Sequence, residues 1–147
     1  MSIRDTDSMT LRLVDELVEY QIREIAAWAA DDTNAVNRNV DQIIKRLDLL
    51  KGTRDGRTAL EDLMSHELPE VRLTAAGAVL AWAPEKAIPV LGRIVAERRP
   101  PSPDKPRQPI AFDAAISLYE HWGIRSYNRD DLIEPLARYG VELEPRR

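Results

Sequence analysis

The chain of 147 residues contains no cysteine and only two histidines, His66 and His121. The absence of cysteine excludes disulfides, a thiolate nucleophile and zinc held by thiolates. Two histidines make a poor metal site, so we expect His66 to form a hydrogen bond at a corner and His121 to lie at the surface. Motifs for phosphate, dinucleotide or serine-hydrolase chemistry are also missing. The sequence therefore predicts no catalytic residues, no cofactor and no metal, and we expect that the protein is not an enzyme.

Long apolar runs are missing as well. The longest covers residues 75–83 and includes Gly77, whereas a membrane-spanning helix needs about 20 apolar residues. The first residues, MSIRDTDSMT, are charged and lack the apolar segment of a signal peptide. We therefore expect no membrane segment and no export signal, and we expect the protein to be located in the cytoplasm.

The charge of the chain is uneven. The net charge is −4, yet residues 93–107 contain a basic cluster made of Arg93, Arg98, Arg99, Lys105 and Arg107. Prolines between positions 100 and 109 exclude a helix there. Residues 98–109 are thus predicted to form a proline-rich surface loop, either a solvated linker or a polyproline helix that docks on an aromatic groove. Because an acidic body repels phosphates, nucleic-acid binding through the basic cluster is only the alternative function.

Apolar side chains recur at spacings of three and four along most of the chain, which indicates helices and no strand. Thr58 to Glu61 has the spacing of a capping box and is expected to begin a helix. Proline is expected at the start of two later helices, and Pro89 is expected either to delay or to bend the second of them. Predicted helices cover residues 9–29, 34–51, 59–66, 69–83, 84–97, 110–122 and 128–139, and the tail 141–147 is expected to be frayed.

These patterns predict an all-α fold of about six to seven helices in a single compact domain, residues 1–147. On the first helix, the apolar stripe that includes Leu11, Leu17 and Ile22 is expected to face inward and Glu24 to face outward. The helix over 69–83 carries two apolar stripes and is expected to be buried on two sides. Gly77 in its interior is expected to have a packing reason, and the three tryptophans are expected to pack in the core at helix ends.

The run Leu68-Pro69-Glu70-Val71-Arg72, followed by Ala75 and Ala76, resembles the HEAT-repeat signature. In such repeats a proline opens the second helix, and the arginine commonly pairs with an aspartate before the corner, where this chain has His66. The wider pattern, with Leu60, Leu63 and the Ala83-Pro84-Glu85 corner, is similar to a bacterial family of small HEAT-like proteins of unknown function. The resemblance spans residues 9–122 and implies a HEAT-like α-α superhelix.

By analogy with HEAT repeats, the helix over 69–83 is an inner helix whose remaining stripe faces a groove. The candidate partner-binding residues on this stripe are Glu70, Thr74, Gly77 and Ala81. The main functional prediction is therefore a module that binds another protein. The acidic body favours a basic partner, as for an immunity protein that neutralises a toxin.

Overall fold

The computed structural model describes residues 3–97 and 110–145, with side chains from Ser8 onward. Helices account for 77% of these residues, and no strand occurs among them. The all-α prediction is therefore confirmed. The described residues form two compact units: unit 1 is residues 3–63, and unit 2 is residues 64–97 with 110–145.

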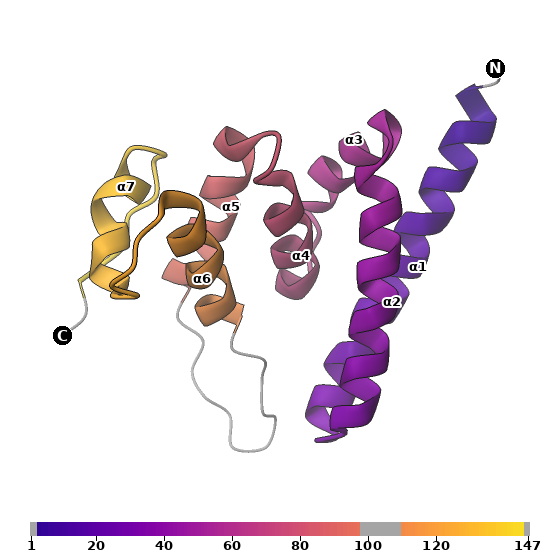
Figure 1. Ribbon diagram of the computed structural model, residues 1–147, viewed down its shortest axis with the longest axis horizontal. Helices are drawn as coiled ribbons and strands as arrows, with labels where there is room; N and C mark the ends of the chain where they lie inside the picture. The colour runs from indigo at the N-terminus through magenta and orange to yellow at the C-terminus, as the bar shows by residue number, and fades with distance from the viewer. Residues whose placement is uncertain (1–2, 98–109, 146–147) are drawn as a thin grey trace. The chain divides into compact units, whose positions relative to one another are not determined.

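Unit 1 is a long helical hairpin closed by a shorter helix (Figure 1). Helix α1 (Ile3–Ala29) and helix α2 (Thr33–Lys51) lie side by side, and α3 (Arg54–Leu63) packs against both. The turn between α1 and α2 places Asp31 at a φ of 55°, a left-handed conformation that aspartate tolerates better than most residues. The Asp32 side chain then accepts a hydrogen bond from the Ala35 amide (3.1 Å), as expected for the N-cap of α2.

Helix α3 begins at Arg54, earlier than predicted, so the predicted capping box at Thr58 is wrong. The hydroxyl of Thr53 accepts the Gly56 amide (2.9 Å), whereas Thr58 lies inside the helix and donates to the Arg54 carbonyl (3.2 Å). Gly56 makes this early start sterically feasible, because a Cβ there would lie only 2.0 Å from the Leu50 carbonyl oxygen. The polar residues 54–57, which lie between two of the predicted helices, therefore form the first turn of a helix held against the end of α2.

Unit 2 consists of short helices. They are α4 (Pro69–Val79), α5 (Pro84–Ala96), α6 (Ile110–Trp122), the 3-10 helix η1 (Arg129–Leu132) and α7 (Ile133–Ala137). Pro69 and Pro84 stand in the first turns of α4 and α5, as predicted. Pro89 lies inside α5, which starts at Pro84 and so is not delayed. The Asn128 side chain caps η1 by accepting from the Asp130 amide (3.1 Å).

The core of unit 2 is built around α5, which packs against α4 and α6. Gly92 of α5 is buried, and a Cβ there would lie 2.6 Å from the Leu136 side chain and 3.2 Å from Val141. This close approach lets the segment after α7 pack on α5, with Val141 and Leu143 each 5% exposed. The described part of the tail is therefore packed rather than frayed at these two residues.

Two expectations about packing in unit 2 are wrong. Nothing lies within 4 Å of a Cβ built at Gly77, and this glycine is exposed, so it has no packing reason. The apolar stripe of the helix over 110–122 predicts that Phe112 faces inward, but Phe112 is 62% exposed. Helix α4 does bury both of its apolar stripes in part, although it ends at Val79 and Leu80 is only half-buried.

Candidate functional site

The buried face of α1 differs from the predicted one. Leu17 is fully buried, as expected, but its buried neighbours on the helix are polar: Thr10, Gln21 and Glu24 are 8%, 4% and 1% exposed. Gln21 donates a hydrogen bond to the Glu24 carboxyl group (2.5 Å), which partly offsets the cost of burying these polar groups. The prediction that Glu24 faces outward is wrong, because the apolar arc of α1 is wider than the face that packs.

The rest of that arc faces solvent and forms the outer stripe, defined here as Leu11, Asp15, Val18 and Ile22. Their spacing of four, three and four residues places them on one face of α1. Leu11 is 62% exposed and Ile22 is 48% exposed. Val18 is half-buried and Asp15 is exposed. The helix thus presents two large apolar side chains on either side of a carboxylate.

Most acidic side chains near the outer stripe already have cationic partners. Glu19 pairs with Arg23 (3.1 Å), and Glu16 pairs with Arg12 (3.6 Å). By contrast, Asp15 forms no ion pair with any side chain in the described part of the chain. Its carboxylate is therefore available to a cation from outside the molecule.

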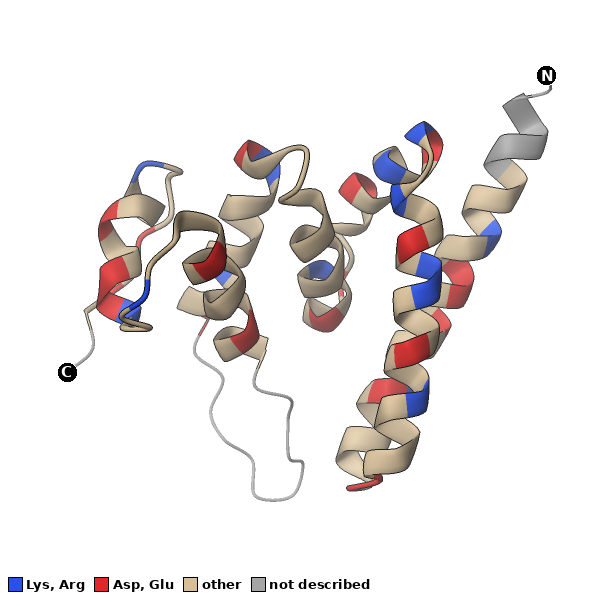
Figure 2. Cartoon of the chain, in the orientation of Figure 1, with Lys and Arg blue, Asp and Glu red and all other residues tan. Residues whose placement is uncertain are grey.

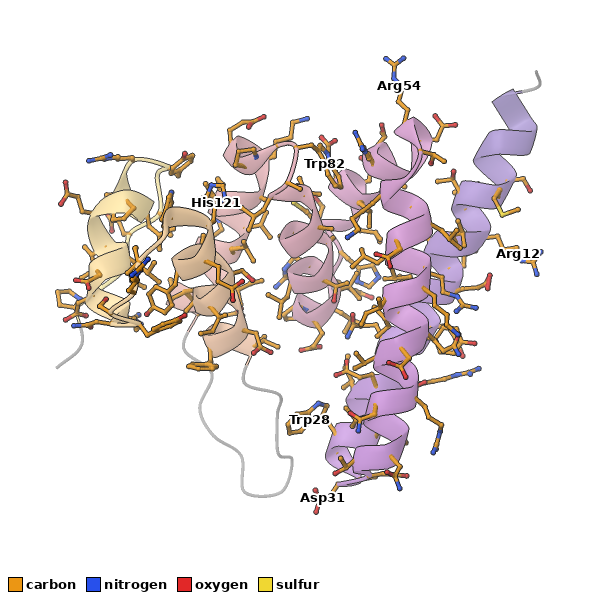
Figure 3. All side chains as sticks on the ribbon, in the orientation of Figure 1. Arg12, Trp28, Asp31, Arg54, Trp82 and His121 are labelled. Atoms are coloured by element: carbon orange, nitrogen blue, oxygen red, sulfur yellow. The ribbon has the colours of Figure 1, made fainter. Side chains whose placement is uncertain are left out.

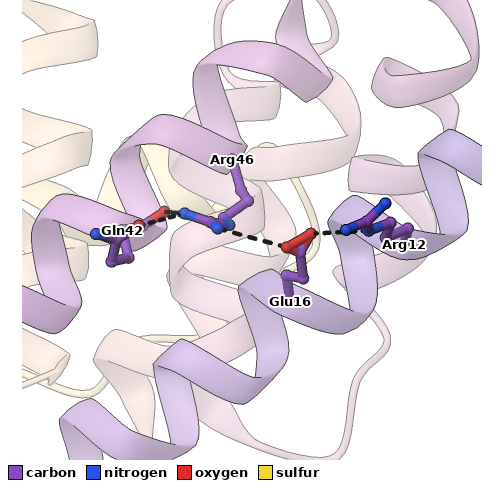
Figure 4. Close-up of polar contacts among 4 residues, drawn as sticks. All are labelled: Arg12, Glu16, Gln42 and Arg46. Carbon is purple, nitrogen blue, oxygen red and sulfur yellow. Dashed lines mark hydrogen bonds and ion pairs between the residues drawn. The ribbon is translucent and has the colours of Figure 1, made fainter.

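A polar network on the other side of α1 fixes the rotation of this helix against α2 (Figure 4). Arg46 of α2 pairs with Glu16 of α1 (3.4 Å) and donates to the Gln42 side-chain oxygen (2.5 Å). Its guanidinium also lies over the Tyr20 ring, 4.6 Å from the centroid. Because these contacts hold the Glu16 side of α1 against α2, the outer stripe is directed away from that contact.

Trp28 was expected in the core but is 36% exposed at the end of the hairpin. Figure 3 shows Trp28 and Asp31 at this same end of unit 1. They line a small hollow of about 200 Å³ together with Ala27, Asp32, Thr33, Val36 and Asn37. The Asp32 carboxylate already accepts a hydrogen bond at the N-cap of α2, so it is less available to a ligand in this hollow.

A larger hollow, the unit 2 groove, has a volume of about 570 Å³. Met64 before α4, helices α4 and α5, and the segment after α7 contribute to it. Four charged side chains line it: Arg72, Arg93, Glu97 and Glu142. The other lining residues are Met64, Val90, Ile94, Ala96, Gly140 and Val141.

Arg72 is held in place by the corner that precedes α4. Its Nη1 donates to the carbonyls of His66 (2.8 Å) and Glu67 (3.0 Å). The same corner is closed by His66, whose Nδ1 accepts from the Leu68 amide (3.0 Å). The predicted hydrogen bond of His66 is thus confirmed, and Arg72 contacts backbone carbonyls where HEAT repeats commonly use an aspartate.

The residues predicted to bind a partner lie on α4 or just after it. Glu70 and Thr74 are half-buried, while Gly77 and Ala81 are exposed, and Ala81 lies beyond the end of the helix. None of the four lines either hollow described above. Of the predicted basic cluster, only Arg93 can be placed, on the unit 2 groove. Arg98, Arg99, Lys105 and Arg107 lie outside the described residues, as does the predicted loop 98–109.

Sequence reasoning missed both the outer stripe and the unit 2 groove. The available signal for the stripe was the width of the apolar arc on α1, which exceeds what one neighbouring helix covers. No comparable signal marked the groove, because its residues come from three separate segments of the chain.

Within residues 3–97 and 110–145, no three histidine, aspartate or glutamate side chains gather as metal ligands would. Partial burial raises the pKa of the Asp113 carboxyl, in the first turn of α6, above the ordinary value of 3.8. Asp113 lines neither hollow, so this shift bears on stability rather than on a site. Among the described helices, none combines the length and the apolar character needed to cross a bilayer.

These features define an all-α protein of two helical units. The chain matches the model of a domain of unknown function, DUF2019, over residues 12–104, and it belongs to that family. The match runs from α1 through α5, so it includes most of the outer stripe and part of the unit 2 groove. No curated protein and no solved structure matches the chain.

Proposed function

We propose that the protein is a non-enzymatic interaction module whose outer stripe binds an amphipathic helix of a basic protein. The supporting observation is that Leu11 and Ile22 are 62% and 48% exposed on the same face of one helix. Large apolar side chains gathered on one face are typical of protein-binding surfaces. Spacings of three and four residues are those by which one helix packs against another.

The negative charge of Asp15 favours a partner helix that carries a positive charge. Asp15 lies between Leu11 and Ile22 and has no cationic partner among the described residues. A partner helix with apolar residues facing Leu11 and Ile22 and a lysine or arginine facing Asp15 satisfies all three groups. An acidic helix is disfavoured by like-charge repulsion at Asp15 and at the neighbouring Glu19.

We also propose that unit 2 is built as a HEAT-like repeat. The support is the proline at the start of α4, the Val71-Arg72 pair in its first turn, and the bonds from Arg72 back to the preceding corner. A bacterial, cytoplasmic setting fits a chain without cysteine. The stripe made of Glu70, Thr74, Gly77 and Ala81 stays a second predicted surface. Nucleic-acid binding is less favoured because Glu97 and Glu142 line the same groove as Arg93.

Site-specific crosslinking tests this proposal. A photoreactive residue is placed at Leu11 and, as a matched control, at Phe112, because both side chains are 62% exposed. We expect a discrete crosslinked protein from position 11 and none from position 112. That protein, once identified and purified, should bind the wild type in a salt-sensitive manner and bind Ile22→Lys and Asp15→Lys variants at least about tenfold more weakly.

Three outcomes contradict the proposal. The first is equal crosslinking at both positions, which indicates nonspecific apolar contact. The second is a crosslink to another copy of this chain, which makes the stripe a self-association surface. The third is a partner whose affinity is unchanged by Asp15→Lys.

A further inference from the structure

We propose that the unit 2 groove binds a small zwitterion with an apolar body, of the chemical class of an apolar α-amino acid. This inference is independent of the proposed partner helix, because the groove and the outer stripe lie in different units. At about 570 Å³ the groove has the size of a small-molecule site.

Two side chains of opposite charge in the groove are left without partners. Arg93 and Glu142 both line it, and neither forms a hydrogen bond or ion pair through its side chain within the described residues. They are not paired with each other, since no nitrogen–oxygen distance between them is within 4.0 Å. A ligand that carries both a carboxylate and an ammonium offers a partner to each side chain, the carboxylate to the guanidinium and the ammonium to Glu142.

The remaining wall fits the body of such a ligand. Ile94 and Val141 are nearly buried at 2% and 5% exposure, and Val90 and Met64 extend the apolar surface. A branched or aromatic side chain can cover these groups and remove apolar area from water. Arg72, held by the His66 and Glu67 carbonyls, adds a second guanidinium that does not need to be ordered on binding.

The charges also exclude other classes of ligand. A phosphate-bearing molecule meets Glu97 and Glu142 as well as the two arginines, so its second negative charge is repelled. A cation without a negative group is repelled by Arg72 and Arg93. A zwitterion supplies one charge of each sign, which is what Arg93 and Glu142 lack within the described residues.

Titration by calorimetry or ligand-observed NMR tests this inference with the full-length protein. The probes are leucine, leucinamide, which lacks the carboxylate, N-acetylleucine, which lacks the ammonium, and glycine, which lacks the apolar body. We expect leucine to bind and each of the other three to bind at least about tenfold more weakly. Arg93→Gln and Glu142→Gln should each weaken leucine binding by about tenfold as well.

The matched control is the exposed pair Glu134 and Arg138 in the same unit, whose side chains are 85% and 74% exposed outside the groove. Glu134→Gln and Arg138→Gln should leave leucine binding unchanged. The inference is overturned if leucine does not bind at about 10 mM, because that concentration would reveal even a dissociation constant of about 1 mM. It is equally overturned if N-acetylleucine or a peptide ending in leucine binds as tightly as leucine, or if Arg93→Gln binds like the wild type.

Discussion

The two units differ in which side chains they bury. In unit 1 the buried polar side chains Thr10, Gln21 and Glu24 all lie on α1, while the same unit exposes large apolar ones. Within the described part of unit 2, no polar or charged residue is buried to that degree. The exposed large apolar residues are Met9, Leu11, Ile22, Trp28, Ile44 and Leu49 in unit 1, and Phe112, Tyr127 and Tyr139 in unit 2.

This difference indicates what each unit is suited to do. Unit 2 has a core of small and aliphatic side chains around α5, and this core gains free energy from its own apolar burial. Unit 1 buries polar groups at a cost and leaves apolar area in water. An arrangement of that kind is favourable when a partner covers the exposed face, which is why we propose that the main interaction surface lies on α1.

The largest expected effect concerns the corner of unit 1. In Gly56→Ala the added Cβ would lie 2.0 Å from the Leu50 oxygen and 2.7 Å from two other Leu50 backbone atoms, none of which can rotate away. We expect the free energy of unfolding to fall by at least about 3 kcal/mol, measured by urea denaturation.

Gly77→Ala in unit 2 is the matched control, because nothing lies within 4 Å of its Cβ. It should raise the free energy of unfolding by about 0.5–1 kcal/mol, since alanine favours a helix interior over glycine. Equal effects of the two substitutions would remove the distinction between a packing glycine in unit 1 and an open one in unit 2.

A smaller effect is expected at the ion pairs. Arg46 and Glu16 in unit 1 keep only 18% and 32% of their side-chain exposure, and Arg46 also contacts Gln42 and Tyr20. Arg46→Met should lower the free energy of unfolding by about 1–2 kcal/mol. In unit 2, Arg138→Met should cost less than about 0.5 kcal/mol, because its pair with Glu134 is exposed. A result in which Arg138→Met costs as much as Arg46→Met would mean that the network does not hold α1 in place.

The smallest effect concerns pH and unit 2. Burial raises the pKa of the Asp113 carboxyl above 3.8, so the folded state binds this proton more tightly than the unfolded state. Stability contributed by the protonated group is complete below pH 3.8 and is lost as the pH rises through the folded pKa. Asp113→Asn should therefore have a slightly higher Tm than the wild type at pH 7, with the difference shrinking as the pH falls toward 3.8. A difference in Tm that does not vary with pH would contradict this reading.

Helical periodicity was sufficient to predict the fold class, because the spacing of apolar side chains follows from the local geometry of a helix. It failed at α3, because the polar residues before Thr58 fell outside the predicted helices. The close contact of Gly56 with Leu50, which holds this turn, is visible only in three dimensions. Sequence reasoning also chose Gly77 as the packing glycine, whereas Gly56 and Gly92 have close neighbours. The sequence alone does not show which residues pack against a glycine within a helix.

The candidate sites show the same limit. The apolar arc of α1 was visible in the sequence, but which part of it packs depends on α2 and α3, and the packed part proved to include Gln21 and Glu24. Arg93 was singled out for its neighbours in sequence, yet its described surroundings include Glu142, which lies far along the chain. Which residues lie near Arg93 depends on tertiary contacts, and helical periodicity does not report these.

The central claim, that α1 turns an apolar stripe to solvent, is tested most directly by thiol labelling. Since the chain has no cysteine, Leu11→Cys and Leu17→Cys each introduce a single reactive thiol. The native side chains at these positions are 62% and 0% exposed. Under native conditions the account predicts rapid modification at position 11 and strong protection at position 17, because the latter reacts only when unit 1 opens. Equal rates at the two positions, or faster modification at position 17, would contradict the account.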